Sequence, residues 1–213
     1  MQTTTQRYAA AFIAAMCWFA LVIQFWLILD SVSGAEASIL AIVRYFSFFT
    51  ILTNLAVAIS CTAKVFSPYS FFARNDIIAA LTVYILIVGI VYNIFLRSLW
   101  QPQGWQLLAD ILLHDATPLL YFLFWLFFIS KEGLKWKFAF MWLLYPFVYI
   151  IYIFLRGAIL VEYPYPFIDI NQIGYQRFIV NSFGLLFAFV IASLLIIAIG
   201  KILDKRSSKT VSL

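Results

Sequence analysis

The single histidine of the chain, His114, lies inside a hydrophobic segment and has two carboxylates close to it in the sequence. Asp110 precedes it by four residues, which is one helical turn, and Asp115 follows it directly. Because ionisable side chains are costly to keep in hydrocarbon, such a cluster indicates a function. An imidazole beside a carboxylate is suited to general-base chemistry, since the carboxylate can fix the tautomer of the ring.

The composition places this cluster in a membrane protein. Hydrophobic residues make up 65% of the 213 residues and charged residues only 11%, far from the balance of a soluble domain. The net charge of +5 comes from residues in short loops and in the C-terminal tail, which indicates membrane orientation and not nucleic-acid binding. Cys17 and Cys61 lie in apolar runs, so we expect buried small hydrophobes and neither a disulfide nor a metal site.

Six apolar segments are long enough to cross a bilayer as helices, because a span needs about 20 residues. We therefore expect an all-α polytopic membrane protein, with residues 1–213 forming a single six-helix transmembrane domain. The predicted spans are about 8–29, 38–63, 77–96, 107–129, 138–156 and 178–202. The first is predicted to be a retained anchor, since it is too long for the apolar region of a signal peptide.

The basic residues orient the predicted spans. With the N-terminus in the cytoplasm, the internal segments contain Arg7, Lys64, Arg74, Lys131, Lys135, Lys137, Lys201, Lys205, Arg206 and Lys209. The external segments contain only Arg97, Arg156 and Arg177. Because cytoplasmic loops carry an excess of Lys and Arg, both termini are predicted to be cytoplasmic.

Polar residues gather toward the external ends of the spans. Arg44, Ser47, Thr50 and Asn54 follow spacings of three, three and four, which would place them on one face of a continuous helix. Helical rise puts Thr50 and His114 at comparable depths, about three and two turns from the external surface. Four further polar residues lie toward the same surface: Asn93, Tyr152, Arg156 and Asn181. Because each needs a partner in hydrocarbon, we expect a polar cavity that opens outward.

Structural roles are the alternatives for some of these residues. Asn181 can serve as an interhelical hydrogen bond, and Thr50 taken alone can bond to its own helix. A lone histidine supplies too few ligands for a bis-histidine haem or a three-histidine zinc site, and no Gly-x-Ser-x-Gly elbow or phosphate-binding glycine loop is present. No cofactor and no metal are therefore expected.

A hydroxyl nucleophile with one base is the chemistry that remains. Thr50 or Ser47 could attack an ester carbonyl while His114 takes the proton. Asp110 could fix the tautomer of His114, and Arg44 or Asn93 could stabilise the oxyanion.

Three stretches resemble the family of the androgen-induced gene product and the androgen-dependent regulator of tissue factor pathway inhibitor. They are residues 44–54 (RYFSFFTILTN), the segment around His114, and residues 163–167 (YPYPF), and their order fits that family from the second to the sixth span. Characterised animal members are membrane threonine hydrolases of fatty acid esters of hydroxy fatty acids. The resemblance implies Thr50, after two phenylalanines, as nucleophile, and His114, before Pro118, as its histidine. It also implies that Tyr163, Pro164 and Phe167 line the cavity mouth.

The resemblance is to the prokaryotic branch, which implies a bacterial inner (plasma) membrane. The expected function is hydrolysis of lipid esters within the membrane, with membrane lipids and a lipid ester or fatty acid as partners. The alternative is a non-enzymatic lipid binder or a small proton-coupled transporter, in which Asp110, His114 and Asp115 form a protonatable site.

Overall fold

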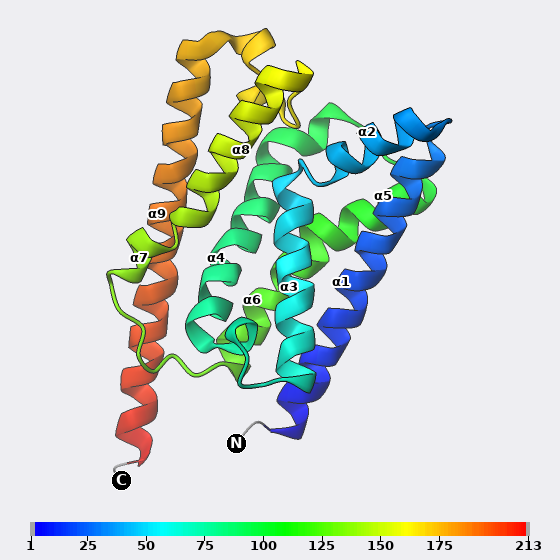
Figure 1. Cartoon of the computed structure of the whole chain (residues 1–213). Coiled ribbons are helices and arrows are strands. Elements are labelled where there is room, and N and C mark those ends of the chain that lie inside the picture. The colour runs from blue at the N-terminus through cyan, green and yellow to red at the C-terminus, as the bar shows by residue number, and fades with distance from the viewer. Residues whose placement is uncertain (1–2, 212–213) are drawn as a thin grey trace. The chain divides into compact units, whose positions relative to one another are not determined.

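A computed structural model describes residues 3–211 of the chain (Figure 1). Within these residues the regular structure is helical throughout, and six helical stretches are long and apolar enough to cross a membrane. They are Thr4–Asp30, Phe49–Phe66, Asn75–Leu99, Gly104–Phe128, Phe138–Leu160 and Ile170–Lys205. The predicted fold class, an all-α membrane protein with six spans, is confirmed.

The chain forms two compact units, residues 1–130 and 131–213, and each is described by itself. The first unit contains α1 (Thr4–Asp30), α2 (Ala35–Tyr45), α3 (Phe49–Phe66), α4 (Asn75–Val91), α5 (Gly104–Ile111) and α6 (Thr117–Phe128). Helix α1 packs along α3, α3 packs on α4, α4 packs on α6, and α6 returns to α1 (Figure 1). Four spans therefore close into a bundle.

Helices α1 and α3, which pack against each other, both bury small side chains. Ala10 and Cys17 on α1, and Val57 and Ala58 on α3, are completely buried. Small residues let two helices approach closely, which increases van der Waals packing between spans. Cys17 and Cys61 are buried free thiols, as predicted from the sequence.

The second predicted span, residues 38–63, is wrong as one continuous helix. Helix α2 ends at Tyr45, residues 46–48 are not helical, and α3 begins at Phe49 at an angle to α2 (Figure 1). The Tyr45 hydroxyl donates to the Leu21 carbonyl at 2.8 Å, and the Tyr45 ring packs edge-to-face on Phe25. The Ser47 hydroxyl donates to the Val43 carbonyl at 2.6 Å. These tertiary and local bonds compete with helix continuation.

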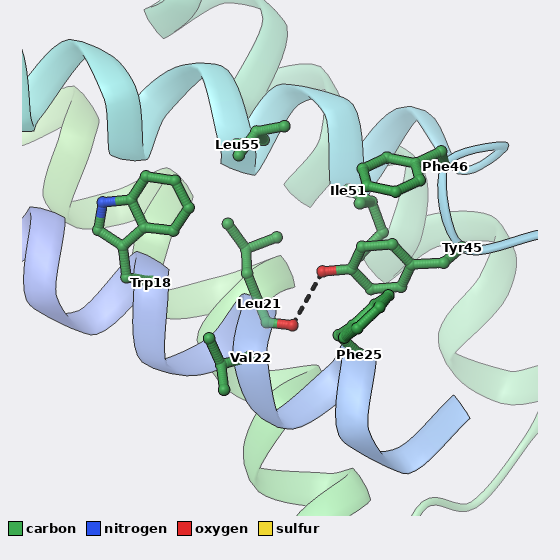
Figure 2. A pocket seen from close by; sticks show the side chains of 8 residues that line it. All are labelled: Trp18, Leu21, Val22, Phe25, Tyr45, Phe46, Ile51 and Leu55. Atoms are coloured by element: carbon green, nitrogen blue, oxygen red, sulfur yellow. Dashed lines mark hydrogen bonds between the residues drawn. The ribbon is translucent and has the colours of Figure 1, made fainter. Parts of the chain in front are cut away.

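This break shapes an apolar groove of about 230 Å³ between α1 and the start of α3 (Figure 2). The rings of Phe25, Tyr45 and Phe46 crowd one end of it, and Trp18 lies at the other. The hydroxyl of Tyr45 is already bonded to the Leu21 carbonyl, so the surface of the groove is formed by apolar side-chain atoms. None of the residues that line it belongs to the set of site residues predicted from the sequence.

Two π-helical turns interrupt the spans of the first unit. The turn η2 (Tyr92–Leu96) follows α4, and the turn η4 (Leu112–Ala116) lies between α5 and α6. In η4 the Thr117 N–H donates to the Leu112 carbonyl, five residues earlier. In the same register the Leu113 carbonyl would accept from residue 118. That residue is Pro118, which has no N–H to donate. Such turns occur frequently at functional sites.

Gly89 on α4 allows the close approach of α4 to η4. A Cβ at this position would lie 3.1 Å from the His114 carbonyl oxygen and 3.2 Å from the Pro118 ring. Backbone and a proline ring cannot easily move away. We therefore expect Gly89→Ala to lower the free energy of unfolding by about 1 kcal/mol, despite the better helix propensity of alanine.

Gly184→Ala is the matched control for this prediction, because no atom lies within 4 Å of a Cβ at that helical glycine. The control variant should unfold at or slightly above the wild-type temperature in detergent. Equal midpoints for the two variants would contradict the close-contact argument.

The second unit contains α7 (Phe138–Met141), α8 (Leu144–Leu160), the short 3-10 turn η5 (Pro166–Ile168) and α9 (Ile170–Val211). Helix α9 is kinked at Gly174, whose φ of 74° is favourable for glycine. The Tyr163 ring packs directly over Gly157, because a Cβ there would lie 2.1 Å from it. The loop between α8 and α9 is thus fixed against α8.

Candidate functional site

His114 is held by the helix turn that precedes it. Its Nδ1 atom lies 3.0 Å from the Asp110 carbonyl oxygen and 3.2 Å from the Asp110 carboxylate atom Oδ1. Because a carbonyl oxygen can only accept, Nδ1 carries the proton and donates to the Asp110 carbonyl, with the carboxylate beside this bond. The other ring nitrogen, Nε2, then has a free lone pair, which is the form that a general base needs. The side chains of His114 and Asp110 are 14% and 5% exposed.

Tyr92, in η2, completes this arrangement. Its hydroxyl donates to Asp110 Oδ2 at 2.5 Å and accepts a hydrogen bond from Trp100 Nε1 at 3.0 Å. Its ring stacks on the His114 imidazole, with centroids 3.8 Å apart and planes 14° from parallel. Sequence reasoning missed Tyr92, although it directly precedes Asn93, one of the polar residues singled out. Its position next to Asn93, among the polar residues at the end of the third span, could have identified it from the sequence.

Asp115 faces η2 as well. It accepts a hydrogen bond from Asn93 Nδ2 at 3.0 Å and forms an ion pair with Arg97. The Arg97 guanidinium also lies 5.4 Å from the centre of the Tyr92 ring, within cation–π distance. Asn93 Nδ2 donates in addition to the Gly89 carbonyl at 2.9 Å. Both of its amide hydrogens are therefore used, so this arrangement does not favour Asn93 as the oxyanion donor.

Asn54 connects the turn that bears Thr50 with the turn that bears His114. Its amide nitrogen donates to the Thr50 carbonyl at 2.9 Å and to the Leu113 carbonyl at 3.2 Å. Asn54 is completely buried, and Thr50 is 7% exposed. The amide oxygen of Asn54 accepts no hydrogen bond from the described residues. A buried acceptor of this kind is suited to a water molecule or a ligand hydroxyl.

The other residues predicted on the second span lie beyond the break. Arg44 is exposed near the end of α2, and Ser47 lies in the non-helical segment with its hydroxyl on the Val43 carbonyl. The predicted single stripe of Arg44, Ser47, Thr50 and Asn54 is therefore wrong. Only Thr50 and Asn54 belong to one helix, because the chain changes direction between residues 45 and 49.

The predicted site residues of the second unit bond to or pack on other residues of that unit. The Arg156 guanidinium donates to the Glu162 carbonyl at 2.7 Å and lies 3.2 Å from its carboxylate. Asn181 donates to the Phe167 carbonyl at 2.7 Å, which joins α9 to the loop that precedes it and not to another span. The ring of Tyr152 packs edge-to-face on Tyr149.

The YPYPF loop is itself well packed. The rings of Tyr165 and Phe167 stack with centroids 5.3 Å apart. Pro164, which precedes Tyr165, is half-buried. Burial, followed by the charges of Tyr175 and Asp169, raises the pKa of Tyr163. A role of Tyr163, Pro164 and Phe167 at a cavity mouth stays a prediction.

Across the part of the chain that the structure describes, no three His, Cys, Asp or Glu side chains are placed to hold a metal ion. Comparison of the chain with protein-family models, with curated proteins and with solved structures finds no match. The resemblance of the second and fourth spans to the androgen-induced family therefore stays a prediction from the sequence.

Proposed function

We propose that this protein is an intramembrane hydrolase of lipid esters, with Thr50 as nucleophile and His114 as general base. The observation that supports it most is the double hydrogen bond of Asn54. One amide nitrogen bonds to the carbonyl of Thr50 and to that of Leu113, so the turns that carry the two groups are neighbours. The fixed Nδ1–H tautomer of His114 leaves Nε2 free to accept a proton.

In the proposed reaction, His114 Nε2 takes the proton of the Thr50 hydroxyl as its oxygen bonds to the ester carbonyl carbon. The carbon–oxygen bond to the alcohol then breaks, and the imidazolium returns its proton to the leaving alkoxide. Water, activated by the same nitrogen, hydrolyses the acyl-threonine. The Asp110 carbonyl accepts from Nδ1 throughout, and the Asp110 carboxylate, 3.2 Å from Nδ1, stabilises the transient imidazolium.

The family resemblance supports the substrate class, an ester between a fatty acid and a hydroxy fatty acid or a similar lipid. The distribution of basic residues supports an orientation with both termini in the cytoplasm, and the resemblance supports a bacterial plasma membrane. These assignments are part of the same proposal.

A fluorophosphonate probe tests the nucleophile, because it transfers its phosphonyl group to an activated hydroxyl and releases fluoride. We expect purified wild-type protein in lipid nanodiscs to be labelled, and Thr50→Ala labelling to fall at least 100-fold. Thr82→Ala is the matched control, since Thr82 is a second buried threonine and its hydroxyl donates to the Ile78 carbonyl of its own helix. Wild-type labelling of Thr50→Ala would exclude Thr50 as the nucleophile.

The neighbouring Asp110 and His114 also support a second candidate, a proton-linked carrier, because ionisable pairs within spans often mark proton pathways. Reconstituted liposomes distinguish the two. Lipid-ester turnover without proton flux supports the hydrolase, whereas pH-dependent proton flux without turnover supports the carrier.

A further inference from the structure

We propose that Tyr92 is a positioning residue for His114, which orients the imidazole both by stacking on it and by holding Asp110. This inference rests on the proposed function where it concerns turnover. Its structural part, the control of the imidazole by Tyr92, can be measured without any reaction.

The hydrogen-bond directions in the cluster follow from the chemistry of its members. The indole N–H of Trp100 can only donate, so the Tyr92 hydroxyl accepts from it and directs its own proton to Asp110 Oδ2. With Oδ2 bound in this way, the carboxylate presents Oδ1 to His114 Nδ1 at 3.2 Å. Tyr92 therefore sets the rotation of the carboxylate that faces the imidazole.

Stacking provides the second restraint. The Tyr92 and His114 rings lie almost parallel with centroids 3.8 Å apart, so rotation of the imidazole plane about the Cβ–Cγ bond is hindered. Tyr92 is only 4% exposed, and the Arg97 guanidinium 5.4 Å from its ring adds a further contact. The same side chain thus restrains both the ring and its carboxylate partner.

Two variants of Tyr92 test the stacking contact and the hydrogen bond separately. Tyr92→Phe keeps the aromatic stack and loses the bond to Asp110, whereas Tyr92→Leu loses both. We expect kcat for ester hydrolysis to fall about tenfold in Tyr92→Phe, with KM changed less than twofold, because a hydrogen bond to a charged group is removed. Tyr92→Leu should lower kcat further. Tyr84→Phe is the control, a buried tyrosine eight residues earlier on α4.

The single histidine makes the direct measurement simple. In protein labelled with ¹⁵N-histidine, the spectrum contains one imidazole, and its nitrogen shifts report which ring nitrogen carries the proton. We expect the Nδ1–H tautomer in the wild type and in Tyr84→Phe, and a mixture of tautomers in Tyr92→Phe. A merely structural tyrosine would lower the unfolding temperature without changing the tautomer.

The outcomes separate the two proposals. A tautomer change in Tyr92→Phe supports the positioning role even if the wild type hydrolyses no ester, in which case the proposed function fails alone. Wild-type nitrogen shifts in both Tyr92→Phe and Tyr92→Leu would overturn the positioning role, whatever the activity of the protein.

Discussion

Asp110→Asn is expected to lower kcat for lipid-ester hydrolysis by about 10³-fold, with little change in KM. An amide at this position can donate to Nδ1, which favours the tautomer with the proton on Nε2 and removes the base. The corresponding substitution in serine proteases costs about 10⁴-fold. We expect a smaller loss here, because the Asp110 carbonyl still accepts from Nδ1 at 3.0 Å.

The change is nearly isosteric, so the unfolding temperature should move little. Asp76→Asn is the control, because Asp76 pairs with Arg74 at the exposed start of α4. Initial rates in nanodiscs, measured with a chromogenic fatty-acid ester, give both constants. A kcat of Asp110→Asn within threefold of the wild type would contradict the orienting role of the carboxylate.

Hydropathy alone predicted the spans, because membrane insertion depends on the sum of side-chain transfer energies over about 20 residues. The predicted and observed spans overlap in all six cases, and Cys17 and Cys61 are buried as expected. The break between α2 and α3 could not be predicted in this way. It depends on the partners of Tyr45, the Leu21 carbonyl and the Phe25 ring, which lie about 20 residues earlier in the chain.

The same limit applies to the candidate site. The pairing of His114 with Asp110 could be predicted, because both lie one turn apart on one helix. The contacts of Tyr92 could not, because they require η2 and η4 to face each other, which depends on the small size of Gly89. Asn93 was predicted as an oxyanion donor, but it donates to Asp115 and to its own helix.

The role of Asn54 follows from Pro118. Proline at position 118 cannot donate to the Leu113 carbonyl in the π-helical register, and the Asn54 amide donates there instead at 3.2 Å. An unsatisfied carbonyl inside a membrane protein is costly, and side chains of neighbouring helices commonly satisfy it. The proline and the asparagine are therefore expected to be energetically coupled, although 64 positions separate them in the sequence.

Asn54→Leu is expected to lower the free energy of unfolding by about 2 kcal/mol, because two buried hydrogen bonds are lost and the Leu113 carbonyl has no donor. Restoring an N–H in the Pro118→Ala background should reduce this cost, since residue 118 can then bond to the Leu113 carbonyl. We expect a coupling energy of about 1 kcal/mol from the double-mutant cycle, measured by reversible unfolding in mixed micelles.

Val57→Leu, a change of size at a completely buried position one turn further along α3, is the control for the cycle. Its cost should be the same in both backgrounds, because Val57 has no polar group to share with Pro118. An Asn54→Leu cost that is equally independent of Pro118 would show that the amide does not compensate for the proline. The Asn54–Leu113 hydrogen bond would then not be what holds the Thr50 turn next to the His114 turn.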